Sequence, residues 1–137
     1  MTASIRDLCA ADHNDDAERI AGWTRNKTEA GVTRMLANPD TALYVAEIEG
    51  DVAAVGSVQA DGSIGLNYVA PAFRFRGVSR ALLAYMEDVL RDRGLTAATL
   101  VSTKTAHRFY RGAGWRDDGD EAERMGLNGI PMRKDLR

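Results

Sequence analysis

Residues 68–83 read YVAPAFRFRGVSRALL, and this stretch joins a predicted strand to a predicted helix. The apolar and aromatic run before it, Ile64 to Val69, favours a strand, whereas Arg80 to Arg93 carries apolar residues at helical spacing. Pro71 has no N–H and disfavours the helical conformation at the residue before it, Ala70. The strand must therefore stop, and the backbone must turn, before the helix begins.

The turn that follows has the pattern Arg-x-x-Gly-x-Ser, formed by Arg74, Gly77 and Ser79. A glycine lets a ligand approach the backbone closely, and the first helical turn leaves its N–H groups free. The helix dipole and two further arginines, Arg76 and Arg80, add positive charge at the same place. This combination predicts an anion-binding site. The simpler alternative is an ordinary arginine-rich helix start with a turn glycine.

The order of these parts resembles the acyl-CoA signature of the GCN5-related N-acetyltransferase family, in which a strand and Val-x-Pro precede Arg-x-x-Gly-x-Gly or Ala and a long helix. Ser79 departs from the family at the second small position, although its N–H can still donate. Neither Gly-x-x-x-x-Gly-Lys-Ser/Thr nor Gly-x-Gly-x-x-Gly occurs in the chain.

The resemblance implies acetyl-CoA as cosubstrate and no metal. In the family, backbone groups of the strand that corresponds to Tyr68 and Val69 pair with the pantetheine arm and polarise the thioester carbonyl. The residues that the resemblance assigns to cofactor binding are Tyr68, Val69, Arg74, Phe75, Arg76, Gly77, Val78, Ser79, Arg80 and Phe109.

Composition limits the class of protein. The 137 residues fit one domain, 1–137, and the net charge of −2 argues against a general nucleic-acid binder. The single cysteine, Cys9, excludes an intramolecular disulfide and a cysteine-rich metal site, and it suits a reducing compartment. The charged N-terminal stretch does not resemble a secretory signal, and no run approaches the roughly 20 apolar residues of a membrane helix. We therefore expect a cytoplasmic protein without a membrane or nucleic-acid partner.

The first forty residues carry mostly helical signals. Ser4 to Leu8 could form a short first strand, and Asp12 has the side chain of an N-cap for a helix that runs toward Trp23. A second helix is predicted over Glu29 to Ala37, with Thr28 as its cap and Asn38-Pro39 as its stop.

From residue 41 onward the pattern becomes that of strands joined by short polar turns, which indicates an antiparallel meander. A helix then buries one apolar stripe, while Glu87 and its charged neighbours are expected to face water and Gly94 to end the helix. The next strand returns by a crossover and should run parallel to Ile64 to Val69. The ranges predicted as strands are 41–48, 52–59, 64–69, 95–102, 115–117 and 130–135, and those predicted as helices are 80–93 and 104–112.

These elements predict an α/β (α+β) fold: a mixed, mostly antiparallel sheet with a central parallel strand pair and helices on both faces. The family resemblance implies the same arrangement along nearly the whole chain.

A second signature supports the first. Ala106-x-x-Phe109-Tyr110 followed by Gly114-Trp115 resembles the family's Asn-x-x-Ala-x-x-Phe-Tyr segment, with Thr103 in place of the asparagine. Tyr110 occupies the position from which many members protonate the leaving thiolate. A phenol with a pKa near 10 can donate to a thiolate whose pKa is about 8.5. The alternative is a half-buried helix aromatic whose hydroxyl faces water.

The sequence names no general base. Glu47 and Asn67 are cleft candidates by strand position only, and His107 lies three residues before Tyr110, although a surface role is commoner for such a histidine. Acceptor choice is expected from 22–28, with Trp23, and from the connection 118–129. An acidic group at 117–123 could attract a cationic amine, or could be a solvated loop.

Three functions remain open. The first is an N-acetyltransferase that transfers an acetyl group to a primary amine of a small molecule or protein by direct attack on the thioester. The second is a non-catalytic acyl-CoA-binding sensor or interaction domain of the same fold. The third, a nucleotide-binding regulatory domain, is disfavoured because the chain lacks a P-loop lysine. Oligomeric state is left open, with a homodimer among the possibilities.

Overall fold

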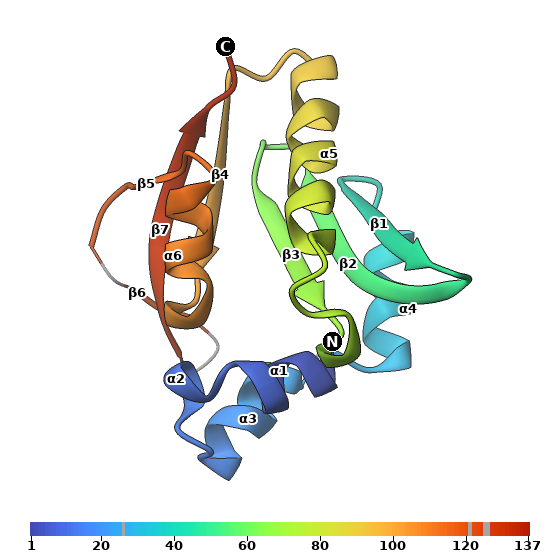
Figure 1. Cartoon of the computed structure of the whole chain (residues 1–137). Helices are drawn as coiled ribbons and strands as arrows, with labels where there is room; N and C mark the ends of the chain where they lie inside the picture. The colour runs from blue at the N-terminus through green and yellow to red at the C-terminus, as the bar shows by residue number, and fades with distance from the viewer. Residues whose placement is uncertain (26, 121, 125–126) are drawn as a thin grey trace.

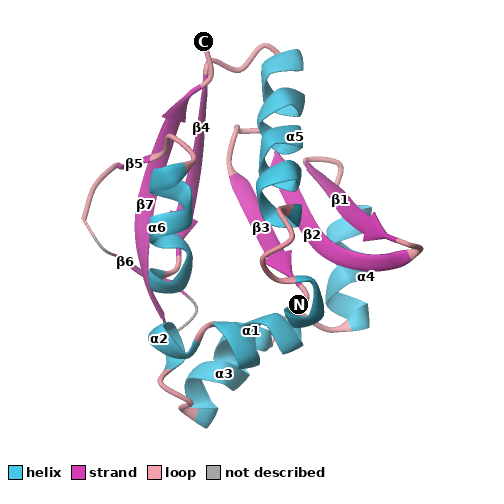
Figure 2. Ribbon diagram, in the orientation of Figure 1, coloured by secondary structure: helices cyan, strands magenta, loops and turns pink. Residues whose placement is uncertain are grey.

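The computed structural model describes residues 1–25, 27–120, 122–124 and 127–137, with the side chains of 122–124 and 127–128 left out. The helices are α1 (Thr2–Leu8), α2 (Ala10–His13), α3 (Ala17–Thr24), α4 (Glu29–Ala37), α5 (Val78–Asp92) and α6 (Lys104–Gly112), with a 3₁₀ turn η1 (Pro71–Phe73). The strands are β1 (Thr41–Ile48), β2 (Asp51–Gln59), β3 (Ile64–Val69), β4 (Ala97–Ser102), β5 (Arg116–Asp117), β6 (Ala122–Arg124) and β7 (Leu127–Asp135). The helices α1 to α4 come first, the strands β1 to β3 follow, and helices and strands are mixed in the rest of the chain (Figures 1 and 2).

The strands form two antiparallel sheets that meet along one short parallel contact. One sheet has the order β1-β2-β3 and the other β4-β7-β5, with β6 pairing β7. A parallel bridge joins Ser63 to Thr99, where the Thr99 N–H donates to the Gly62 carbonyl at 3.2 Å. Beyond this bridge β3 and β4 diverge toward the end that carries α1 to α3 (Figure 1). The predicted mixed sheet with a central parallel pair is confirmed.

Helices cover both faces of the strands. α5 lies over β2 and β3, and α4 lies behind β1 (Figure 2). Gly56 allows α5 to approach closely, because a Cβ at this position would lie 2.6 Å from the sulfur of Met86. The core beneath α5 contains Leu82, Leu83 and Leu90, which are almost fully buried, and removal of this apolar surface from water stabilises the sheet–helix layer.

The first prediction for the N-terminus was wrong, because residues 4–8 belong to helix α1 and not to a strand. Ile5 and Cys9 lie four residues apart and are both buried against Trp23. That spacing places two side chains on one face of a helix, whereas a strand would separate neighbours such as Ser4 and Ile5, which are both buried here.

The predicted N-cap was also wrong. Asp12 lies inside α2, and the cap of α3 is Asp16, whose Oδ1 accepts from the N–H groups of Glu18 at 2.9 Å and Arg19 at 3.2 Å. By contrast, α4 begins as predicted, since the Thr28 hydroxyl oxygen accepts from the Gly31 N–H at 3.0 Å.

Helix α5 starts two residues before the predicted boundary, directly after Gly77. Gly94 has the expected left-handed conformation, with φ 83°. Glu87 does not face water as predicted: it is 4% exposed, and its Oε1 lies 2.5 Å from the Nζ of Lys134 on β7. A buried carboxylate is tolerated because this ion pair compensates its charge.

The C-terminal third follows the predicted order with one addition. α6 has the predicted bounds, β5 and β7 lie near their predicted positions, and the connection contains the short strand β6. None of the helices in the described part of the chain has the length and apolar character needed to cross a membrane.

Candidate functional site

The loop between β3 and α5 leaves the helix N-terminus open. Gly77 is the N-cap residue, with φ 75°, and no side chain among the described residues caps the helix. The first turn of α5 holds no acidic residue, and a Cβ built on Gly77 would meet no atom of the described part of the chain within 4 Å. The N–H groups at Val78, Ser79 and Arg80 therefore stand without an intrahelical acceptor at a freely approachable surface.

Arginines and aromatic rings surround this helix start. Arg74 and Arg76 are exposed, and their guanidinium carbons lie 4.5 Å from the ring centroid of Phe75 and 5.5 Å from that of Phe73, respectively. Such cation–π contacts hold the arginines beside the loop. Phe75 has φ 64°, which is unfavourable for a residue with a Cβ, and its ring is 90% exposed. The loop thus presents two cations and one apolar ring to solvent.

The last residue of β3 directs its backbone into the gap between the two sheets. The Ala70 N–H donates to Ala53 of β2 at 2.7 Å, and Val69 is paired with Ala54. Successive residues of a strand turn their N–H and C=O groups to opposite sides, so the polar backbone groups of Val69 point away from β2 and toward β4. These groups can pair with an extended ligand placed between β3 and β4.

Tyr110 lies inside the same gap. Its side chain is 6% exposed, and its hydroxyl oxygen accepts from the Nδ2 of Asn67, on β3, at 3.1 Å. The ring packs edge-on against Trp115, with centroids 6.0 Å apart, and against Phe109 at 5.2 Å. Burial raises the pKa of Tyr110 to about 12, and the hydrogen bond from Asn67 opposes this shift.

The ring of Tyr110 is buried and its hydroxyl contacts Asn67 on β3, so Tyr110 is not a half-buried aromatic whose hydroxyl faces water. Phe109 is partly buried beside it.

Two of the three candidates for the general base, His107 and Glu47, do not face the gap between β3 and β4. His107 Nε2 is 2.6 Å from the Oδ1 of Asp117, and Glu47 is exposed on β1. Neither is among the described residues that line the cavity presented in the next paragraph. Asn67 lies in the gap, but a neutral amide cannot act as a general base.

A cavity of about 1030 Å³ opens on the face opposite α5. Trp23, Lys27, Asp118 and Gly129 line it, so the two segments predicted to choose the acceptor do meet here. The Trp23 indole N–H donates to the Tyr68 hydroxyl at 3.1 Å. Of the predicted acidic group, Asp118 lines the cavity and Asp117 pairs with His107; Glu121 and the side chain of Glu123 lie outside what the structure describes.

The walls of this cavity also carry charges from other elements. Further lining residues are Arg34, Asp40, Asp61, Gln59, Ser57 and Tyr68. Burial raises the pKa of Tyr68 to about 12, so the phenol is neutral near pH 7. The cavity combines an aromatic wall with side chains of both charge signs, since Lys27 and Arg34 line it as well as the carboxylates.

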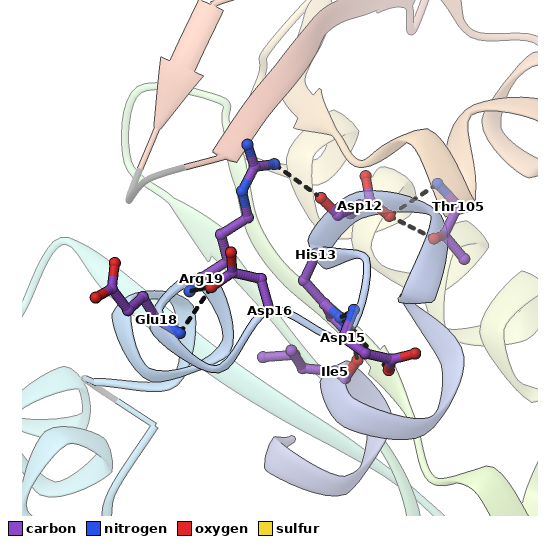
Figure 3. A network of polar contacts seen from close by, with 8 residues as sticks. All are labelled: Ile5, Asp12, His13, Asp15, Asp16, Glu18, Arg19 and Thr105. Carbon is purple, nitrogen blue, oxygen red and sulfur yellow. Dashed lines mark hydrogen bonds and ion pairs between the residues drawn. The ribbon is translucent and has the colours of Figure 1, made fainter.

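Sequence reasoning missed the contact that attaches the N-terminal helices to α6. Figure 3 shows the Asp12 carboxylate beside Thr105 at the start of α6, where it accepts from the Thr105 backbone N–H at 3.1 Å and from the Thr105 hydroxyl. The same carboxylate accepts from the backbone N–H of Lys104 at 2.5 Å. Thr103, which replaces the family's asparagine, also caps α6, because its hydroxyl oxygen accepts from the Ala106 N–H at 3.1 Å. No local pattern signals the Asp12 contact, since the partners lie 92 and 93 residues apart.

His13 stabilises the turn that places Asp12. Its ring is fully buried, with Nε2 2.8 Å from the Ile5 carbonyl and Nδ1 accepting from the Asp15 N–H at 2.9 Å (Figure 3). Because Nδ1 accepts, Nε2 carries the proton of a neutral imidazole. This ring is therefore engaged in the fold and is not a free base.

Among the residues that the structure describes, no group of three or more His, Cys, Asp or Glu side chains could hold a metal ion. The features that do suit a ligand are the open start of α5, the backbone of Val69 and the buried hydroxyl of Tyr110. They fit a long, flexible, phosphate-bearing group laid between β3 and β4.

Comparison with known proteins places the chain in a family. A family model described as an acetyltransferase (GNAT) domain matches residues 9–136. An acetyltransferase from Sodalis glossinidius (strain morsitans) is 34% identical over 101 residues, which are 65% of this chain and 70% of that protein.

Solved structures show the same fold. A GCN5-related N-acetyltransferase from Rhodopseudomonas palustris superimposes with a TM-score of 0.85 at 23% identity, covering 98% of this chain and 84% of that one. PaiA N-acetyltransferase from Thermoplasma acidophilum, solved in complex with coenzyme A, has a TM-score of 0.77 at 14% identity, covering 98% of this chain and 89% of that one. The chain therefore belongs to the GNAT family and is an acetyl-CoA-dependent N-acetyltransferase.

Proposed function

We propose that the protein transfers the acetyl group of acetyl-CoA to a primary amine by direct attack of the amine on the thioester, with Tyr110 as the proton donor. The observation that carries this proposal is the divergence of β3 and β4 around the Tyr110 hydroxyl, next to the outward-turned backbone of Val69. Bound acetyl-CoA supplies an acetyl group activated as a thioester.

The open start of α5 would hold the pyrophosphate. The N–H groups of Val78, Ser79 and Arg80 can donate to phosphate oxygens, and the helix dipole favours negative charge there. Arg74 and Arg76, exposed beside the loop, can reach further phosphate oxygens. Ser79 keeps its N–H, so the departure from the family's small residue does not remove a donor.

The backbone of β3 would orient the arm and its carbonyl. Val69 turns its N–H toward β4, and a donor at this place stabilises negative charge that develops on the carbonyl oxygen during attack. Such a donor is effective because the sheet holds it rigidly, so no reorganisation is needed during the reaction.

Tyr110 would give its proton to the departing thiolate. A pKa of about 12 would make it a weak acid toward a thiol in water, but burial affects a thiol in the same direction. A thiolate that leaves in the same buried surroundings is also more basic than in water, so burial raises the proton affinity of both groups.

The acceptor amine would enter from the cavity on the opposite face. Its lining carries both the carboxylates of Asp40, Asp61 and Asp118 and the basic side chains of Lys27 and Arg34. The carboxylates would bind a cationic amine, and the Trp23 ring would contact an apolar portion of the acceptor. The amine loses its proton to water in the open cavity before it attacks, since an ammonium group has no lone pair.

The test is thiol release from acetyl-CoA across a panel of primary amines, with calorimetry of CoA, acetyl-CoA and ATP binding. The proposal expects amine-dependent thiol release, and binding of CoA and acetyl-CoA. Acetyl-CoA binding without thiol release for any amine would instead support a sensor, and binding of ATP alone would support a nucleotide-binding domain.

Tyr110→Phe removes the proton donor while keeping the ring. We expect kcat to fall by about 10²-fold or more, the usual contribution of a positioned acid, with little change in acetyl-CoA affinity. Tyr85→Phe is the matched control, because Tyr85 is 54% exposed on α5. Wild-type turnover in Tyr110→Phe would contradict the assignment.

A further inference from the structure

Asn67 is the residue through which β3 contacts the hydroxyl of Tyr110. The two side chains are 43 residues apart in sequence, and the contact joins the first sheet to α6 across the gap. Asn67 and Tyr68 are adjacent on β3 and so point to opposite faces. Tyr68 lines the acceptor cavity, whereas Asn67 is not among the described residues that line it. Asn67 thus belongs to the side of the gap where Tyr110 acts.

The direction of the hydrogen bond matters for catalysis. The Asn67 amide donates, so the Tyr110 oxygen accepts and its own O–H is left to donate elsewhere. A carboxylate or carbonyl at this place would accept a hydrogen bond from the Tyr110 O–H, and the phenolic proton would then point away from the thiolate. An amide donor also stabilises the phenolate left after proton transfer.

The carbonyl half of the Asn67 amide has no hydrogen-bond partner within the described part of the chain. Among the described residues, the Oδ1 of Asn67 is buried and accepts no hydrogen bond. A buried, unsatisfied acceptor is unfavourable, so an apolar side chain of similar shape would suit the fold at least as well. The amide is therefore poorly explained by a purely structural role.

We propose that Asn67 is a positioning residue for the transfer reaction, holding the Tyr110 hydroxyl by its oxygen so that its proton is directed to the leaving thiolate. This role rests on the proposed function of Tyr110. Asn67 takes part in no bond change: the amine nitrogen bonds the acetyl carbon and gives up one of its protons to water, the carbon–sulfur bond breaks with its electron pair on sulfur, and sulfur takes the Tyr110 proton. Asn67 donates to the resulting phenolate oxygen until water returns the proton.

Asn67→Leu tests the role by kinetics and by stability. We expect kcat to fall by about 10-fold or more, while calorimetry gives an acetyl-CoA affinity within about 3-fold of wild type. In the Tyr110→Phe background, Asn67→Leu should cause no further loss of kcat, because the two residues act as one unit. The double variant Asn67→Leu/Tyr110→Phe removes both polar partners and should unfold at or above the wild-type temperature.

Asn67→Asp adds a pH readout that a structural role would not produce. The ionised carboxylate can only accept, so the Tyr110 O–H donates its hydrogen bond to the carboxylate and not to the thiolate. The protonated carboxyl can donate to the Tyr110 oxygen as the amide does. The ratio of variant to wild-type kcat should therefore be highest at low pH and fall as pH rises through the pKa of the introduced carboxyl.

Glu87→Gln is the matched control, because it weakens the buried pair with Lys134, which also joins a helix to a distant strand. It should lower the unfolding temperature and keep kcat, the opposite signature to the double variant.

Wild-type kcat in Asn67→Leu, a pH-independent ratio for Asn67→Asp, or an unfolding temperature of the double variant below that of Glu87→Gln would overturn the role. If the wild-type protein releases no thiol with any amine, the proposed function fails and this role fails with it; an active wild type with an equally active Asn67→Leu overturns this role alone.

Discussion

Three buried ionisable groups gather where the N-terminal helices meet the gap between the sheets. Cys9 is 7% exposed, and burial, reinforced by the nearby Asp12 charge, raises the pKa of its thiol from 9.0 to about 11. Tyr68 and Tyr110 have their pKa values raised to about 12, chiefly by burial. Each group is therefore neutral near pH 7, and this end of the gap is a place of low polarity that strengthens the electrostatic contacts made inside it.

Because its pKa is raised, the Cys9 thiol should make the unfolding free energy depend on pH. The folded chain binds the thiol proton more tightly than the unfolded chain, so the stabilisation is complete below pH 9 and is lost as pH rises toward 11. Between pH 8 and pH 10.5 the wild type should lose about 2 kcal/mol more unfolding free energy than Cys9→Ala. Urea denaturation at the two pH values measures this difference. Equal losses in the two proteins would show that the thiol is not shifted.

At the scale of elements, the two ends of α5 have different tasks. Gly77 and Gly94 flank the helix and both have left-handed backbone conformations. A Cβ at either would meet no atom within 4 Å in the residues that the structure describes. The first precedes amides that are offered to a phosphate, whereas the second only ends the helix. The same substitution at both ends separates backbone strain from ligand binding.

Gly77→Ala and Gly94→Ala should each lose about 1 kcal/mol of stability, because alanine is strained at positive φ. Only Gly77→Ala should also raise the Kd for acetyl-CoA, by about 10-fold, because its methyl group lies in the approach of the phosphate to the helix start. Thermal unfolding and calorimetry measure the two effects. A similar Kd for both variants would place the phosphate away from α5.

Helix α6, which carries Tyr110, is held by a carboxylate from the other end of the chain. Asp12→Ala leaves the backbone N–H groups of Lys104 and Thr105 without this acceptor, so we expect a loss of about 2 kcal/mol in unfolding free energy. The kcat should fall as well, since α6 positions the proton donor. Asp7→Asn, on the exposed face of α1, serves as control and should stay within about 0.5 kcal/mol of wild type. Wild-type stability in Asp12→Ala would mean that Thr103 alone suffices as the cap.

Helices and strands with clear local signals could be predicted from the sequence, whereas contacts between distant elements could not. β1 to β3, α4 and α6 were predicted nearly to the residue, because alternation, caps and short polar turns are local signals. The loop from Pro71 to Gly77 was predictable for the same reason. Helix α1 was missed because its seven residues offer too few turns to separate helical from strand periodicity. Contacts between distant residues, such as Asp12 with Thr105 or Asn67 with Tyr110, depend on how the elements pack and leave no trace in a local pattern.

At the scale of the whole molecule, the two sheets are joined along β3 and β4 by one parallel bridge, and below it each strand pairs only with its own sheet among the described residues. The ends of β3 and β4 therefore depend on packing from the helices: α5 lies on β3, α6 lies on β4, and Tyr68 of β3 packs against the N-terminal helices. A ligand arm that pairs with the Val69 backbone would supply the missing edge contacts. Ligand binding should thus stabilise the gap more than the outer strands.

Hydrogen exchange can measure this difference. At a concentration about 100 times the Kd, acetyl-CoA should stabilise the folded chain by about 2.7 kcal/mol, and exchange should slow most at the amides of Asn67 and Val69, which face β4. Amides in the β1–β2 hairpin should slow only through global stabilisation, so they provide the internal control. Gly77→Ala at the same ligand concentration should show a smaller effect at Val69, because its phosphate contact is weakened. Uniform slowing across both sheets, or no slowing at Asn67 and Val69, would show that the carrier arm does not lie between β3 and β4.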